Sequence, residues 1–212
     1  MARTKSSNQW LQRHVKDPFV RKARADGYRS RAAYKLIEIN TRERFLVAGA
    51  KVVDLGAAPG GWSQVAAQKV APGGRVVAVD LLEMAPMSGV TVLRGDCREP
   101  AIQAQLAAAL AGAKADVVLS DLSPNISGIA SADQARAAEL VQMAVDFCGA
   151  QLKTEGAFLV KVFQGGEFAA VLREMKLRFR EVKTVKPSAS REESRETYLL
   201  ARGLRPTGFR PA

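Results

Sequence analysis

Residues 52–63 read VVDLGAAPGGWS, an apolar run followed by a glycine-rich turn that ends in a tryptophan. The apolar run predicts a β-strand, and the Gly60-Gly61 pair marks the turn into a following helix. A strand, a glycine turn and a helix start are the usual parts of a nucleotide-binding site in an α/β fold. The stretch therefore predicts a class of fold and the place of a ligand within it.

The rest of the chain alternates between strand and helix patterns. Apolar spacing predicts a helix at about 30–45, with Ser30 as its N-cap. Strands are expected at 51–55, 75–80, 90–94, 115–120, 157–163, 179–184 and 197–201, and further helices at about 61–70, 100–111, 132–152 and 166–176. Several of these strands are continuous apolar runs, which is typical of a sheet covered on both faces. We predict a basic arm at 1–29 and one α/β domain at 30–212, with a mostly parallel seven-stranded sheet flanked by helices.

The charge of the chain is concentrated at its N-terminus. The protein carries 32 Lys and Arg against 21 Asp and Glu, a net charge of +11. Residues 1–31 hold nine basic and two acidic residues, so seven of the eleven net charges lie there. Trp10, Phe19 and Tyr28 are interleaved with them. Such a pattern suits RNA, because phosphates pair with the charges and unstacked bases pack on the rings. Alternatively, the aromatic rings attach the arm to the domain.

Composition excludes several classes of protein. No segment approaches the roughly 18 uninterrupted apolar residues of a membrane span, so we expect no membrane partner. Cys97 and Cys148 stand far apart and in no metal-ligand spacing, which indicates a reducing cytosol, a cytoplasmic protein and no structural zinc. The single histidine, His14, has no partner in the sequence. The arginine-rich start is also similar to a mitochondrial transit peptide.

The glycine turn departs from both common phosphate-binding patterns. The dinucleotide fingerprint G-x-G-x-x-G lacks its second glycine here, and Trp62 stands where a P-loop carries its lysine. An adenosine cofactor without phosphates remains, and S-adenosylmethionine is the common one. Asp80, at the end of the second strand, is suited to the two ribose hydroxyls, and Asp96 to the adenine amino group. A structural turn with acids at strand ends by chance is the alternative.

Lys161 interrupts the apolar strand AFLVKVF, where lysine is rarely buried. A lysine that extends its amine out of a strand end would explain it simply. A desolvated lysine beside another cation, however, loses its proton more readily and can act as a base. Lys35 in the first predicted helix is a candidate neighbour, although an ordinary solvated helix lysine is the simpler interpretation of that residue.

Five blocks together resemble one family. They are RSRAAYKL (29–36), VVDLGAAPGGWSQ (52–64), SDLSPN (120–125), VKVFQG (160–165) and SRETYLL (194–200). In this order they are similar to the FtsJ/RrmJ ribosomal RNA 2′-O-ribose methyltransferases, over residues 10–201. The resemblance implies a Rossmann-like, S-adenosylmethionine-dependent methyltransferase fold. The block at 121–125 reads Asp-Leu-Ser-Pro-Asn where bacterial members have Asp-Met-Ala-Pro-Asn, which keeps Asp121.

The same resemblance implies the site residues and the substrate. The implied catalytic tetrad is Lys35, Asp121, Lys161 and Glu196, and the implied cofactor contacts are Gly60, Trp62, Asp80, Asp96 and Asp121. In this family the substrate is a uridine ribose of large-subunit (23S) ribosomal RNA in the nearly assembled 50S subunit. Lys161 would take the proton of the 2′-hydroxyl, Asp121 would orient Lys161, and Glu196 would position the ribose. No metal is required, and we expect a monomer.

Other functions remain open at this point. Relatives of this family act on transfer RNA, mitochondrial ribosomal RNA and messenger caps. The compact chain favours the bacterial ribosomal type, because a resemblance that begins by Trp10 leaves too little leader for a transit peptide. A non-catalytic RNA-binding ribosome assembly factor is a second alternative, which the complete tetrad disfavours. A small-molecule methyltransferase would not need the basic arm.

Overall fold

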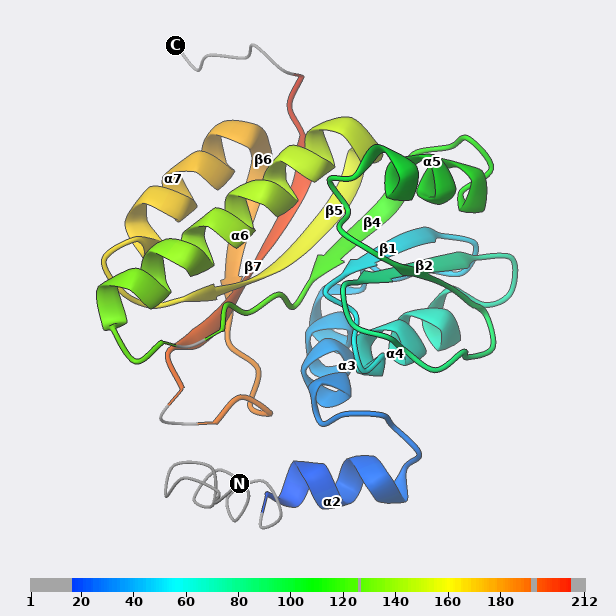
Figure 1. Ribbon diagram of the computed structural model, residues 1–212, viewed down its shortest axis with the longest axis horizontal. Coiled ribbons are helices and arrows are strands. Elements are labelled where there is room, and N and C mark those ends of the chain that lie inside the picture. Colours follow the sequence, from blue (N-terminus) through cyan, green and yellow to red (C-terminus); the bar gives the residue numbers. More distant parts are fainter. Residues whose placement is uncertain (1–16, 126, 192–193, 207–212) are drawn as a thin grey trace.

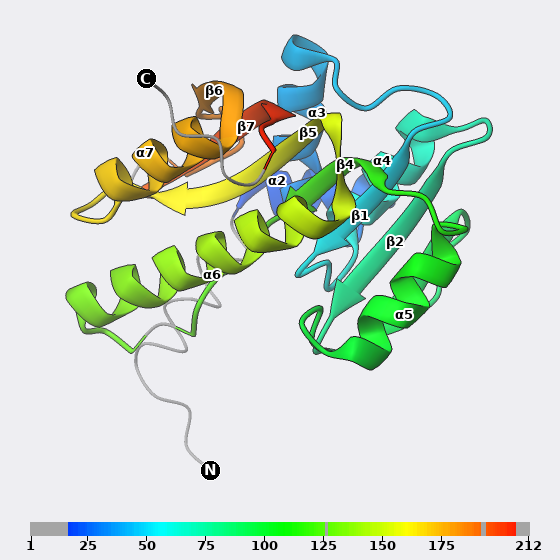
Figure 2. The same cartoon turned by 90° about the horizontal axis from the view of Figure 1, so that it is seen from above.

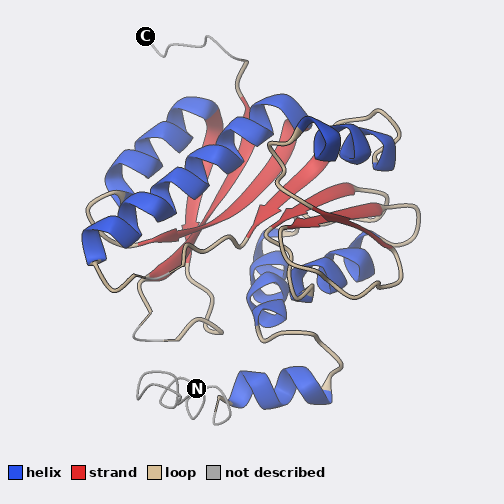
Figure 3. Cartoon of the chain, viewed as in Figure 1, coloured by secondary structure: helices blue, strands red, loops and turns tan. Residues whose placement is uncertain are grey.

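The computed structural model describes residues 17–125, 127–191 and 194–206. A seven-stranded sheet in the order β3-β2-β1-β4-β5-β7-β6 lies between two layers of helices (Figures 1 and 3). The strands are β1 Lys51–Leu55, β2 Arg75–Asp80, β3 Val90–Arg94, β4 Ala115–Ser120, β5 Leu152–Phe163, β6 Phe179–Val185 and β7 Glu196–Leu204. The helices are α2 Pro18–Ala25, α3 Ala32–Glu43, α4 Gly61–Val70, α5 Pro100–Ala109, α6 Ala130–Gln151 and α7 Phe168–Arg178. The predicted α/β fold is confirmed.

The connections of the sheet place the ends of several strands at one edge. Strands β1 to β5 are parallel, whereas β7 runs antiparallel to both β5 and β6. The chain moves outward from β1 to β3 and then returns to β4 on the other side of β1, which is where open α/β sheets bind ligands. Because β7 is reversed, its first residue, Glu196, pairs with Phe163 at the end of β5. Glu196 therefore joins the carboxyl edge of the parallel strands.

Helices cover both faces of the sheet. Helices α5, α6 and α7 pack on one face, and α3 and α4 pack on the other (Figure 2). The first interface contains the stacked rings of Phe158 and Phe179, 5.9 Å apart, and the second contains Leu36 and Val65. Both faces of strands such as β1 are thus buried, which is why these strands are continuous apolar runs.

Several boundaries differ from the sequence prediction, and two of the differences have a clear physical reason. Helix α3 begins at Ala32, with Arg31 and not Ser30 as its N-cap. The Ser30 hydroxyl instead lies against Gly61 at the start of α4, where a side chain on Gly61 would overlap it. Strand β5 begins at Leu152, five residues earlier than expected, because an exposed polar segment extends the strand before its buried part.

Part of the predicted arm is a helix that the sequence analysis missed. Helix α2 begins after Asp17, whose carboxylate caps it by accepting a hydrogen bond from the Phe19 N–H at 3.0 Å. Val20 and Ala23 on its inner face are buried. The boundary between arm and domain at residue 29 stays a prediction.

Two of the three aromatic residues of the arm attach it to the domain. The rings of Phe19 and Tyr28 lie 5.6 and 5.7 Å from the ring of Tyr34 in α3. Trp10 lies outside the described residues. The structure therefore shows that Phe19 and Tyr28 attach the arm to the domain.

The described segments contain neither a membrane-spanning helix nor a metal-binding cluster of side chains. No helix within them is long and apolar enough to cross a membrane. No group of three or more His, Cys, Asp or Glu side chains within them is arranged to hold a metal ion.

Candidate active site

A cavity of about 900 Å³ opens at the carboxyl edge of the sheet. Its lining includes four residues at or just after strand ends, namely Gly56, Asp80, Asp96 and Asp121. Helix α6 contributes Glu139 and Met143, among others, to the cavity wall. The fold therefore gathers acids from three separate strand ends around one space.

The glycine turn is held by its neighbours on both sides. The Gly56 N–H donates to the Val79 carbonyl of β2 at 2.9 Å, and Gly56 has φ +73°. Gly60 is the N-cap of α4, with φ +109°. Both values favour glycine. Gly56 and Ala58 of this turn line the cavity, and α4 begins directly after it at Gly61.

Asp80 connects the glycine turn to the segment after β2. Its Oδ2 accepts from the Ala58 N–H at 2.9 Å, and its Oδ1 accepts from the Leu82 N–H at 2.8 Å. A carboxylate oxygen has two lone pairs, so each can accept one more hydrogen bond. Asp80 can therefore take a pair of ligand hydroxyls while it holds the two backbone segments.

Asp96 is already paired within the protein. The Arg98 guanidinium contacts both carboxylate oxygens, with Nε 2.9 Å from Oδ1 and Nη2 2.5 Å from Oδ2. The Arg98 side chain holds the pKa of Asp96 below its usual value. A ligand amino group at this position would share an acceptor with an exposed arginine.

The predicted cofactor contacts Gly60 and Trp62 are not among the residues that line the cavity. The Trp62 indole is 3% exposed, and its Nε1–H donates to the Ala32 carbonyl at 2.8 Å. This hydrogen bond joins α4 to the start of α3. Contact of either residue with a cofactor stays a prediction, and for Trp62 it would have to use backbone atoms.

A buried carboxyl lies directly behind the turn. Asp54 of β1 is 0% exposed, and its Oδ2 accepts from the Ser63 hydroxyl at 2.6 Å. Its Oδ1 has no hydrogen-bond partner within the described residues. Burial raises the pKa of Asp54 to about 7, with Asp121 and Asp80 adding to the effect against the Ser63 hydrogen bond.

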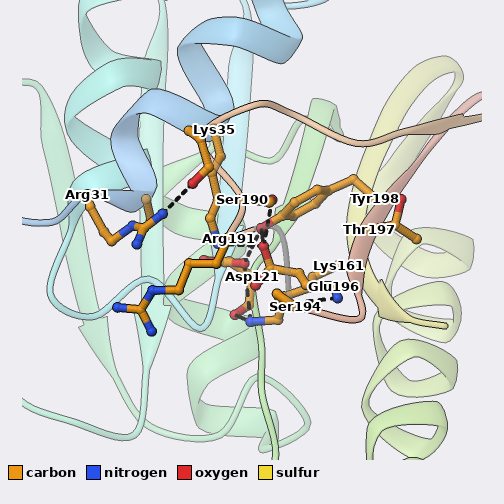
Figure 4. A network of polar contacts seen from close by, with 12 residues as sticks. Arg31, Lys35, Asp121, Lys161, Ser190, Arg191, Ser194, Glu196, Thr197 and Tyr198 are labelled. Atoms are coloured by element: carbon orange, nitrogen blue, oxygen red, sulfur yellow. Dashed lines mark hydrogen bonds and ion pairs between the residues drawn. The ribbon is translucent and has the colours of Figure 1, made fainter. Parts of the chain in front are cut away.

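The four predicted catalytic residues come together beside this cavity (Figure 4). The Lys161 ammonium lies 2.7 Å from the backbone oxygen of Asp121 and 3.2 Å from its Oδ1. The Lys35 ammonium lies 2.5 Å from Oε1 of Glu196. Residues 35 and 196 are 161 positions apart in the chain, and only the antiparallel β7 brings them together.

Glu196 is surrounded by donors on one of its two oxygens. Its Oε1 accepts from Lys35, from the Ser190 hydroxyl at 3.1 Å and from the Tyr198 hydroxyl at 3.0 Å. Burial alone would raise the pKa of Glu196, but Lys35, then Lys161 and Tyr198, lower it below its usual value. Glu196 is therefore a carboxylate at neutral pH.

Tyr198 links the two ion pairs, and the sequence analysis missed it. Its hydroxyl lies 3.1 Å from Oδ1 of Asp121 as well as 3.0 Å from Glu196. Burial and the two carboxylates raise its pKa far above the usual range. Tyr198 pairs with Lys161 across the β5–β7 ladder. A weak signal was present, because Tyr198 lies in the predicted strand 197–201, two positions after Glu196, and alternate residues of an extended chain share one face.

Comparison with known proteins gives a consistent picture. Residues 28–204 match the family described as FtsJ-like methyltransferase. The chain is 54% identical over 205 residues to the ribosomal RNA large subunit methyltransferase E of Nitrosospira multiformis, covering 97% of this chain and 100% of that protein. It is 52% identical to the protein of the same name from Marinobacter nauticus, covering 97% of this chain and 99% of the relative.

Two solved structures have a similar fold. A ribosomal RNA methyltransferase of Plasmodium falciparum superposes with a TM-score of 0.75 at 28% identity, over 84% of this chain and 98% of that one. The fibrillarin of Aeropyrum pernix, solved with S-adenosyl-L-methionine bound, has a TM-score of 0.57 at 18% identity, over 82% of this chain and 75% of that one. The second similarity is one of fold alone.

Proposed function

Because the chain belongs to the FtsJ-like methyltransferase family, we propose that it methylates the 2′-hydroxyl of a uridine ribose in large-subunit (23S) ribosomal RNA. The methyl donor is S-adenosylmethionine. The observation that carries the proposal is the meeting of two lysine–carboxylate pairs, Lys161 with Asp121 and Lys35 with Glu196, beside the cavity. This arrangement provides a base and charged groups to orient a hydroxyl.

The cavity fits this cofactor in size and in chemistry. About 900 Å³ is within the usual range for small-molecule sites, and the lining mixes apolar with polar groups. Asp80 would hold the ribose hydroxyls, Asp96 the adenine amino group, and the start of α4 the carboxylate. Leu81 and Leu82, both mostly exposed, supply apolar wall beside Asp80. When bound, S-adenosylmethionine supplies an electrophilic methyl group.

Lys161 is proposed as the general base. A neutral amine has two N–H groups and one lone pair. Asp121 offers two acceptors, its backbone oxygen and its Oδ1, which can take both N–H groups. The amine then has only its lone pair left, and this lone pair can accept the proton of the 2′-hydroxyl. Asp121 thus orients the base without blocking it.

Lys35 and Glu196 have supporting roles. The Lys35 ammonium keeps Glu196 ionised, since their atoms are 2.5 Å apart. Glu196 is proposed to accept a hydrogen bond from the ribose and thereby to align its 2′-oxygen with the reacting carbon. Alignment of this kind supplies a large share of the rate in transfer reactions.

The substrate is proposed to be held by the basic arm. Arg21, Lys22 and Arg24 of α2 are exposed, whereas Val20 and Ala23 are buried, and the Lys22 ammonium lies 4.8 Å from the centre of the Tyr34 ring. Cations of this kind contact phosphates without reading sequence. We propose that the protein acts as a monomer on the nearly assembled 50S subunit, where a large rigid RNA surface presents one ribose.

The test is methyl transfer with three separate substrates. The purified protein and labelled S-adenosylmethionine are incubated with 50S subunits from cells that lack this protein, with naked 23S RNA and with transfer RNA. The modified position is then mapped by 2′-O-methyl-sensitive sequencing. We expect one methylated uridine, and highest turnover on the 50S subunit. Methylation of transfer RNA alone would support the alternative substrate, and no transfer to any RNA would support a non-catalytic assembly role.

A further inference from the structure

All hydrogen bonds that the structure gives the Glu196 carboxylate fall on Oε1. Lys35, Ser190 and Tyr198 donate to this one atom, at 2.5, 3.1 and 3.0 Å. No described residue donates to Oε2, which leaves that oxygen for another partner. We propose that Ser190 is a positioning residue that fixes Oε1 of Glu196, so that Oε2 is presented to the substrate ribose. This inference rests on the proposed function.

Of the three donors, Ser190 is the short, buried one whose hydrogen bond goes to Glu196 alone. The single proton of Tyr198 is shared between two carboxylates, because its hydroxyl is 3.1 Å from Asp121 and 3.0 Å from Glu196. Lys35 approaches on a long side chain with several rotatable bonds. The Ser190 hydroxyl is on a short side chain that is 7% exposed, and Glu196 is its acceptor. We therefore assign to Ser190, and not to the stronger but longer Lys35 side chain, the role of fixing the rotation of the carboxylate.

The turn that carries Ser190 is itself fixed to α3. The Ser190 N–H donates to the Pro187 carbonyl at 3.0 Å, which closes the turn. Oε2 of Glu38 accepts from the Ser188 N–H at 2.8 Å and the Ala189 N–H at 3.4 Å. Glu38 lies three residues after Lys35 on the same side of α3. One helix therefore holds the Glu196 carboxylate directly through Lys35 and indirectly through the turn (Figure 4).

The test compares the steady-state kinetics of Ser190→Ala and Ser188→Ala, with the 50S subunit as the varied substrate. Ser188→Ala is the control, because it removes a hydroxyl from the same turn that donates to Glu38 at 2.7 Å and not to Glu196, while both backbone hydrogen bonds to Glu38 remain. We expect Ser190→Ala to lower kcat by about tenfold or more, as for one lost hydrogen bond to a charged group. KM for the RNA and the melting temperature should stay close to wild type, and Ser188→Ala should remain within about twofold in kcat.

The pH profile gives a second measurement that a merely structural role would not change. Glu196 must be ionised to accept from the ribose, and Ser190 stabilises the ionised form. Its removal should therefore shift the acid limb of kcat to higher pH, whereas Ser188→Ala should leave that limb in place.

Three outcomes would overturn the positioning role while wild-type turnover is normal. They are an unchanged kcat in Ser190→Ala, a rise in KM without a fall in kcat, and an equal loss in Ser188→Ala. Absence of wild-type methyl transfer to any ribosomal RNA would instead overturn the proposed function, and the role of Glu196 toward a ribose with it.

Discussion

Lys161 contacts Asp121 twice, through the backbone oxygen at 2.7 Å and through the carboxylate at 3.2 Å. The two acceptors belong to one residue at the end of β4, next to the strand that carries Lys161. The direction of the lysine amine is thus set by the pairing of two adjacent parallel strands. A substitution that keeps the positive charge but cannot release a proton therefore distinguishes a general base from a group that acts only through its charge.

Lys161→Arg should lose methyl transfer while cofactor and RNA still bind. Arginine keeps the positive charge but does not release its proton in a protein. A general base contributes on the order of 10²-fold or more, so we expect single-turnover rates to fall at least about a hundredfold. The control is Lys51→Arg, a partly buried strand lysine at the other end of β1, whose Nζ donates to the Leu110 carbonyl. Activity of Lys161→Arg within tenfold of wild type would leave Lys161 with an electrostatic role only.

Asp80→Asn should weaken S-adenosylmethionine binding without unfolding the protein. Hydrogen bonds to charged groups contribute about 1.5–3 kcal/mol each, so loss of the charge should reduce affinity by at least about tenfold in calorimetry. Asparagine is preferable to alanine, because Asp80 also holds the Ala58 and Leu82 amides. The control is Asp116→Asn, which likewise accepts from a backbone amide, that of Lys51 at 2.8 Å, but lies at the opposite edge of the sheet. Equal affinity of the two variants would contradict the assignment.

Replacement of Arg21, Lys22 and Arg24 by Gln should weaken RNA binding uniformly across sequences. Each lost phosphate contact reduces the slope of log affinity against log salt by somewhat less than one unit. A control variant replaces Lys69, Lys114 and Lys176, three exposed lysines away from the carboxyl edge, and so removes the same charge. An equal change in slope for both variants would mean that net charge alone attracts the RNA.

Asp54→Asn should change how stability depends on pH. The folded-state pKa of Asp54, about 7, lies above the unfolded value of about 3.9, so folding favours the protonated form. Its stabilising contribution is complete below about pH 4 and is lost as the pH rises through 7. Asparagine does not titrate, so relative to wild type the variant should gain up to about 4 kcal/mol in free energy of unfolding between pH 4 and 8, from 1.36 kcal/mol per pKa unit. Denaturation of the cofactor-free proteins across that range measures it. If the free energy of unfolding depends on pH in the same way in wild type and variant, Asp54 does not titrate in this range.

The sequence alone determined the architecture and the family. Local patterns sufficed for most of the strands and helices, because apolar periodicity and glycine turns are short-range signals. The boundary of β5 and the cap of α3 were missed, since an exposed strand end and a helix start held by packing leave weak patterns. The family prediction from five short blocks is confirmed by the match over residues 28–204. The roles of individual site residues stay predictions.

Only the tertiary structure decided which side chains meet. Only the structure shows that the Trp62 indole joins two helices through the Ala32 carbonyl and is buried on the α3 side of the sheet, while its contact with a cofactor stays a prediction. Ser190 carried no catalytic signal in the sequence, and Tyr198 had only its two-residue spacing from Glu196, yet both donate to Glu196. Such contacts depend on strand register and on a reversed β7, which join residues far apart in the chain. A sequence pattern reports the neighbours of a residue along the chain, whereas the chemistry of this site depends on its neighbours in space.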